Sequence, residues 1–147
     1  MTGGEKIAKA AYDWLGTSHV NMAKVKGVGV DCGMLLIACL EDAGLVTPGD
    51  IIIKPYSNEW HLHRSEEWFL SYVQKYCRQV KKPMQGDFFL YQFGRCISHA
   101  GIYIGEDKII HAVVGQGVIM TGTNESMLYD GKGKSRLRAI YRFKGVK

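Results

Sequence analysis

The sequence has no long apolar run, no internal repeat, no low-complexity stretch and no recognisable linker. No window of it reaches the ~18 consecutive apolar residues of a membrane-spanning helix, so membrane insertion is not expected. Residues 1–15 also lack the continuous apolar core of a secretory signal. We therefore expect a single domain over residues 1–147 that is cytoplasmic as made, or that something other than an N-terminal signal delivers.

Paired-cysteine motifs are also missing. The four cysteines lie at positions 32, 39, 77 and 96, and no two have the Cys-x-x-Cys spacing of a zinc or redox site. Without an export signal, free thiols are favoured over disulfides. His61 and His63 alternate as two ligands on one strand face would, but a structural zinc site needs about four ligands. We expect no metal and no cofactor.

The charge is unbalanced toward the basic side, with a net charge of +5. Lysine and arginine are concentrated at residues 78–82 and 132–138. These clusters are either ordinary solvated surface charge or a surface that attracts a polyanion such as a wall polymer. Aromatic residues do not interleave with these clusters as they do on a platform for single-stranded nucleic acid. Nucleic acid is therefore not an expected partner.

What is present is a globular composition, with 46% hydrophobic and 22% charged residues. Apolar spacing predicts a helix over residues 5–15 and a second amphipathic helix over 66–80. Residues 34–40 are all apolar, which predicts a buried helix that opens near Cys32. Helices first and strands later predict an α+β fold, with an antiparallel sheet packed on the central helix. The expected strands cover residues 88–93, 99–104, 108–114, 117–121 and 137–143.

Cys32 is the candidate nucleophile, because a helix N-terminus or a cationic histidine lowers the pKa of a thiol. The free N–H groups of that first turn would also stabilise an oxyanion. A nucleophile of this kind needs a histidine base and a group that orients the base. Only two histidines, His99 and His111, lie on predicted neighbouring strands.

The loop between these strands decides whether the two histidines meet. A three-residue loop over 105–107 pairs Ile104 with Lys108, so that His99 and His111 share one face as diagonal neighbours. A two-residue turn places them on opposite faces. From these residues alone, Cys32 as a small core residue and His99 as a sheet histidine remain open alternatives.

Three motifs resemble the NlpC-type cell-wall peptidases, which have a papain-like fold. They are KGVGVDCG at 26–33, SHAGIYIG at 98–105 and IIHA at 109–112. The segment GDFFL at 86–90 is similar to the strand that this family places before its histidine. The glycine-rich approach to the cysteine and YRF at 141–143 are similar to members encoded by phage tails and gene-transfer particles.

This resemblance implies a cysteine endopeptidase acting on peptidoglycan stem peptides, at the bond between γ-D-glutamate and a diamino acid. By position, Cys32 is the nucleophile, His99 the general base and acid, and His111 the residue that orients His99. Asp31 and Ser98 match positions that bind the free amino end of the stem. The phage-like features imply phage tail proteins as partners and delivery to the wall by a virion or tail particle.

Two departures concern substrate preference. The family's Gly-Thr-Pro-Tyr reads GTSH at 16–19, so that His19 replaces a tyrosine of the substrate site, or is simply a loop histidine. Many members have serine after the cysteine, where this chain has Gly33. These departures motivate a rival interpretation, an inactive structural component of a tail tip or similar assembly. A related amidase or acyltransferase is a third, since a fold does not fix a reaction.

Overall fold

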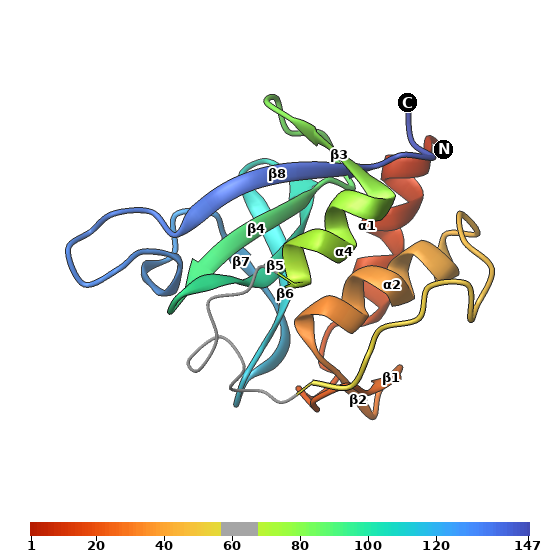
Figure 1. The fold of residues 1–147 in the computed structure, drawn as a ribbon, viewed down its shortest axis with the longest axis horizontal. Coiled ribbons are helices and arrows are strands. Elements are labelled where there is room, and N and C mark those ends of the chain that lie inside the picture. Colours follow the sequence, from red (N-terminus) through yellow and green to blue (C-terminus); the bar gives the residue numbers. More distant parts are fainter. Residues whose placement is uncertain (57–67) are drawn as a thin grey trace.

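The structure is a computed structural model that describes residues 1–56 and 68–147. Its α-helices lie together on one side of a six-stranded sheet, with the two chain ends close to each other (Figure 1). Neighbouring strands of this sheet are antiparallel, in the order β3-β8-β4-β5-β6-β7. The α+β prediction is therefore confirmed. The elements are α1 Gly3–Asp13, β1 Lys24–Val25, β2 Gly29–Val30, α2 Cys32–Asp42, α4 Trp68–Tyr76, β3 Cys77–Val80, β4 Phe88–Phe93, β5 Cys96–Gly105, β6 Lys108–Val113, β7 Gly117–Gly122, the 3-10 helix η1 Ser126–Leu128 and β8 Leu137–Phe143.

Helix α2 is the centre of the core, as the uninterrupted apolar run predicted. All six residues from 35 to 40 are buried, and α1 and β5 pack against the helix. Asp31 caps its N-terminus by accepting a 2.9 Å hydrogen bond from the N–H of Met34. This cap fixes the first turn of α2 at Cys32.

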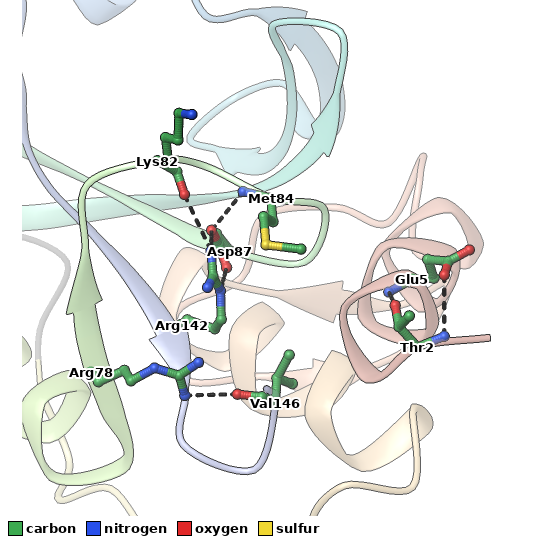
Figure 2. A network of polar contacts seen from close by, with 8 residues as sticks. All are labelled: Thr2, Glu5, Arg78, Lys82, Met84, Asp87, Arg142 and Val146. Atoms are coloured by element: carbon green, nitrogen blue, oxygen red, sulfur yellow. Dashed lines mark hydrogen bonds and ion pairs between the residues drawn. The ribbon is translucent and has the colours of Figure 1, made fainter.

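Helix α1 begins earlier than predicted. Thr2 and Glu5 form a capping box, in which the Thr2 hydroxyl accepts from the Glu5 N–H at 3.1 Å and the Glu5 carboxylate accepts from the Thr2 N–H at 3.2 Å (Figure 2). This reciprocal cap satisfies two N–H groups and starts the helix at Gly3. The helix ends at Asp13, before Gly16, which has a positive φ of 88°.

The second amphipathic helix, α4, ends earlier than predicted. Its predicted start lies outside the described residues, and the chain leaves the helix after Tyr76 to form β3. In β3, Cys77 is buried and pairs with Phe143 of β8. Pairing with the edge of the sheet therefore replaces the last helical turn. Of the five residues predicted for its buried side, two are buried, Phe69 and Val73, and three are half-buried, Trp68, Tyr72 and Tyr76.

An ion pair joins the start of β4 to β8. The Arg142 guanidinium donates to both oxygens of the Asp87 carboxylate, each at 2.8 Å, and the Met84 N–H donates to the same carboxylate at 2.7 Å (Figure 2). Asp87 is only 1% exposed. Since a buried carboxylate needs such partners, Asp87 and Arg142 act here as structural residues.

The two faces of the sheet carry different hydrophobic clusters. The face toward the helices belongs to the main core, with Ile102 and Ile110 among its residues. The other face carries a smaller cluster that includes Tyr91 and Ile109, covered by Leu128 of η1. Within residues 1–56 and 68–147, no helix has the length and apolar character needed to traverse a bilayer.

Candidate active site

Cys32 is the first residue of α2 and is half-buried. Its Sγ lies 3.5 Å from the carbonyl oxygen of Ser98 in β5. Burial, and to a smaller extent the negative charge of Asp31, raises the pKa of this thiol to about 12, although hydrogen bonds from the N–H groups of Ala100, Gly33 and Cys32 itself act in the opposite direction. The expectation of a thiol acidified by its helix terminus is wrong for the resting site, because desolvation outweighs the N–H groups.

Asp31 is held inside the protein rather than open to the solvent. It is 4% exposed, and its Oδ2 accepts from the Met22 N–H at 2.7 Å and from the Tyr56 hydroxyl. Its Oδ1 caps α2 through the N–H of Met34. Asp31 therefore ties together the loop before β1, the start of α2 and the segment that follows Ile51.

The turn between β5 and β6 differs from the predicted three-residue loop. Gly105 pairs with Lys108, so the loop is the two-residue turn Glu106-Asp107, in which both residues have positive φ. A register shift after Tyr103 then restores the pairing of Ile102 with Ile110, so position 101 again lies opposite position 111. The predicted Ile104–Lys108 pair is therefore wrong. The register shift is a β-bulge, and it still leaves His99 and His111 on one face of the hairpin, as predicted.

His99 and His111 therefore meet, as the sequence predicted. His99 Nε2 lies 2.8 Å from His111 Nδ1, and the ring centroids are 5.0 Å apart. Gly101 leaves room for this approach, since a Cβ at this position would lie 3.0 Å from Ile109 Cδ1 and 3.3 Å from the Cβ of His111. His111 is fully buried, and its Nε2 lies 2.9 Å from the hydroxyl oxygen of Thr121 on β7.

Both rings are neutral near pH 7. Burial lowers the pKa of His99 to about 3, with smaller effects in the same direction from His111 and His19. Burial also lowers the pKa of His111 to about 4. The site at rest thus holds a neutral thiol and neutral imidazoles rather than a thiolate beside a cation. Proton transfer has to accompany attack on a substrate in such a site.

Aromatic rings fix the position of His99. The Phe93 ring meets it edge to face at 5.6 Å, and the Tyr91 ring lies 6.0 Å away. The Arg136 guanidinium lies 4.6 Å from the Phe93 ring centroid and donates to the carbonyl oxygen of Tyr129. The connection between β7 and β8 thereby supports the wall of the site.

A cleft with a volume of about 330 Å³ exposes the site. Five of the six residues selected from sequence line it, and His111 lies behind His99. Ser98 does not offer a free hydroxyl, because its Oγ donates to the Phe93 carbonyl oxygen at 3.2 Å. His19 is both a loop residue and a wall residue of the cleft. The five lining residues are His19, Asp31, Cys32, Ser98 and His99.

Sequence reasoning missed two polar residues of the site, Thr121 and Tyr56. Thr121 lies on β7 opposite Ile109 of β6, where threonine is an ordinary strand residue. Tyr56 lies in an irregular segment, and its contact with Asp31 spans 25 positions. A signal for Thr121 existed only in the register of β7 against β6, which no motif specifies.

The described part of the chain contains no cluster of three or more His, Cys, Asp and Glu side chains able to hold a metal ion. The His61 and His63 pair lies outside the described residues.

Similarity to known proteins agrees with this geometry. Among solved structures, NlpC1 from Trichomonas vaginalis matches 97% of this chain at 18% identity with a TM-score of 0.64. The NlpC/p60 domain of the peptidoglycan hydrolase SagA matches 95% at 17% identity and 0.59. The peptidoglycan hydrolase RipB from Mycobacterium tuberculosis matches 99% at 15% identity and 0.59. At these identities the likeness concerns the fold.

The chain spans 44% of the length of NlpC1, 98% of the SagA domain and 65% of RipB. No curated protein matches the chain in sequence. The model of the NlpC/P60 family matches residues 9–133, which include both strands of the histidine hairpin and the start of α2. By its sequence and its fold, the chain belongs to the NlpC/P60 family.

Proposed function

We propose that the chain is a cysteine peptidase that hydrolyses the peptides of bacterial peptidoglycan. One observation carries the proposal: His99 Nε2 is hydrogen-bonded to His111 Nδ1, so that, among the described residues, Nδ1 of His99 has no hydrogen-bond partner, and the ring shares its cleft with Cys32. Membership of the NlpC/P60 family supports it, as does the fold shared with the peptidoglycan hydrolases SagA and RipB.

In the proposed reaction, His99 Nδ1 takes the proton of Cys32 as Sγ attacks the peptide carbonyl carbon. The carbonyl electron pair moves to oxygen, and the N–H groups of Cys32 and Gly33 at the start of α2 stabilise that charge. The same proton then passes from His99 to the leaving amine, and water releases the acyl group from sulfur. His111 orients His99 throughout.

Substrate binding is assigned to three residues of the cleft wall, Asp31, Ser98 and His19. Both oxygens of Asp31 already have donors, so an ammonium group of the stem peptide would share or displace the Tyr56 hydroxyl. His19 presents an imidazole where the resembling family has a phenol. We therefore expect His19 to affect KM more than kcat.

The bond that we propose joins γ-D-glutamate to the diamino acid, on the strength of the motifs around Cys32 and His99. A defined muropeptide, incubated with the protein and with Cys32→Ala, tests this assignment by mass spectrometry of the products. We expect the wild type alone to release a fragment ending in γ-D-glutamate. Release of sugar from the intact peptide would instead identify an amidase.

Delivery by a phage tail or a related particle is a further part of the proposal, and it would bring phage tail proteins as partners and the cell wall as the place of action. It rests on the resemblance of the glycine-rich approach to Cys32 and of residues 141–143. Within residues 141–143, Arg142 forms the ion pair with Asp87 that joins β8 to the start of β4, so this part of the resemblance also has a structural explanation. Co-purification of the chain with particles, and loss of wall penetration by particles carrying Cys32→Ala, would support delivery.

A second candidate function is an inactive structural component that keeps the fold. The high pKa of the Cys32 thiol favours it, since a thiol with a pKa of about 12 carries little thiolate near neutral pH. Labelling with iodoacetamide separates the two functions. An active site predicts that Cys32 reacts well before the buried Cys39, Cys77 and Cys96, whereas equally slow labelling of all four supports the inert component.

A further inference from the structure

The hydrogen-bond chain that starts at His99 continues beyond His111 to a third side chain. Thr121 Oγ1 lies 2.9 Å from His111 Nε2, on the side of the ring away from His99. Among the described residues, His99 and Thr121 are the two hydrogen-bond partners of the His111 ring. Because His111 is 0% exposed, solvent does not reach Nε2 of its ring. The Thr121 hydroxyl therefore determines whether this nitrogen can act as a hydrogen-bond donor.

We propose that Thr121 is a positioning residue, which holds His111 in the tautomer that lets His99 act as a base. This inference rests on the proposed function of the Cys32 site. To take the Cys32 proton, His99 needs an unprotonated Nδ1 and therefore carries its own proton on Nε2. That proton is donated to His111 Nδ1, so His111 must carry its proton on Nε2 and needs an acceptor there. The Thr121 hydroxyl oxygen is that acceptor.

The same contact becomes more important during the reaction. When the proton of Cys32 moves to His99 Nδ1, His99 becomes a cation whose Nε2–H still donates to His111. The positive charge on His99 strengthens both hydrogen bonds of the chain, including the one that the Nε2–H of His111 donates to the Thr121 hydroxyl oxygen. No carboxylate hydrogen-bonds either ring within the described residues. His111 therefore takes the place that an acidic residue has in other triads, and the Thr121 hydroxyl is the acceptor at the far end of the chain.

Other titratable groups near the pair do not replace Thr121. Within residues 1–56 and 68–147, the titratable groups beside His99 are Cys32 and Asp31 in the cleft, His19 on the loop before β1, and the phenol of Tyr91 on β4. None of them is a hydrogen-bond partner of His111 Nε2. Removal of the Thr121 hydroxyl thus leaves a buried N–H without an acceptor, which lowers the basicity of the pair.

The test uses Thr121→Val, which keeps the shape of the side chain and removes the hydroxyl. Thr121→Ser restores the hydroxyl, and Thr123→Val makes the same change directly after the end of β7, at a residue that is not a hydrogen-bond partner of His111. The rate at which iodoacetamide alkylates Cys32, followed by peptide mass spectrometry at a series of pH values, measures how well His99 acts as the base. Because Thr121→Val leaves the buried Nε2–H of His111 without an acceptor, we expect its rate of Cys32 alkylation to fall by about 5- to 150-fold. We expect Thr121→Ser and Thr123→Val to remain within about threefold of wild type.

Two further readouts separate positioning from loss of structure. We expect the acid limb of the alkylation profile of Thr121→Val to move to lower pH, because its cationic pair has lost a partner. Imidazole ¹⁵N shifts should show His111 protonated on Nε2 in the wild type and as a mixture of tautomers in Thr121→Val. A wild-type His111 protonated on Nδ1, an unchanged rate in Thr121→Val, or a Thr121→Ser variant as slow as Thr121→Val would each overturn the inference. If the shifts and rates follow expectation but no muropeptide is cut, the proposed function fails and the role of Thr121 stands.

Discussion

Replacement of Asp31 by asparagine is expected to make the protein less stable and its nucleophile more acidic. The carboxylate accepts from the Met22 N–H, the Met34 N–H and the Tyr56 hydroxyl, and it is 4% exposed. An asparagine keeps one oxygen, which can still cap α2 through Met34. Its amide nitrogen then faces two donors and satisfies neither as an acceptor.

The expected loss of stability follows from those two contacts. A hydrogen bond to a charged acceptor contributes about 1.5–3 kcal/mol, and the backbone N–H of Met22 loses its acceptor in this variant. We therefore expect Asp31→Asn to lower the free energy of unfolding by about 3 kcal/mol. In a chain of this length, that loss lowers Tm by about 6–12 °C.

The effect on Cys32 has the opposite sign. The charge of Asp31 raises the pKa of the Cys32 thiol, although burial is the larger cause. Without that charge, the thiol pKa falls and the thiolate fraction at a fixed pH rises about tenfold for each unit of the fall. Alkylation rates of Cys32 between pH 7 and 10, measured with the buried Cys39 and Cys77 as internal reporters of unfolding, should therefore increase in Asp31→Asn.

The matched control is Asp50→Asn, which removes the same charge from an exposed loop position. Thermal unfolding and alkylation of this variant should equal those of the wild type. The reasoning is refuted if Asp31→Asn has the same Tm as Asp50→Asn, or if its Cys32 reacts more slowly than in the wild type at every pH.

Three further predictions concern stability and geometry. Arg142→Met should lower the free energy of unfolding by about 3–5 kcal/mol in urea, because it leaves the buried Asp87 carboxylate unpaired, and a loss below 1 kcal/mol would contradict this. The pKa values of His99 and His111, about 3 and about 4, lie below the unfolded value near 6.5, so stability is full above pH 6.5 and falls on acidification by about 1.4 kcal/mol per pH unit for each ring. Urea unfolding at pH 7 and 5 checks this, and His111→Asn should show a smaller difference between the two pH values than the wild type. Gly101→Ala should lower kcat with little effect on KM, since the new Cβ would lie 3.3 Å from that of His111, and a normal kcat would show that the pair tolerates displacement.

Much of the fold was predictable because its patterns are local. The apolar run at residues 34–40 predicted a buried helix, and the helix is α2. The predicted bounds of β4 and β8 match the structure, because alternation and turn residues define strand ends within the sequence itself. By contrast, the apolar spacing predicts helix for residues 77–80, because only the pairing of β3 with β8, 60 to 66 positions away, makes this segment a strand.

The site was predictable where motifs name residues and unpredictable where the environment decides. The proximity of His99 and His111 was predicted correctly, although the turn that produces it was not, because a bulge has no sequence rule here. The direction of the Cys32 pKa was missed, since burial depends on the whole fold. Thr121 was missed because its partner lies on another strand.

The central claim is that Cys32 is a nucleophile that cuts peptidoglycan peptides. Its most direct test measures soluble peptide released from purified peptidoglycan by the wild type, by Cys32→Ala and by Cys77→Ala, whose substitution lies at a buried cysteine of β3. The account predicts release by the wild type and by Cys77→Ala, and none by Cys32→Ala. Release by Cys32→Ala at the rate of the wild type would contradict it.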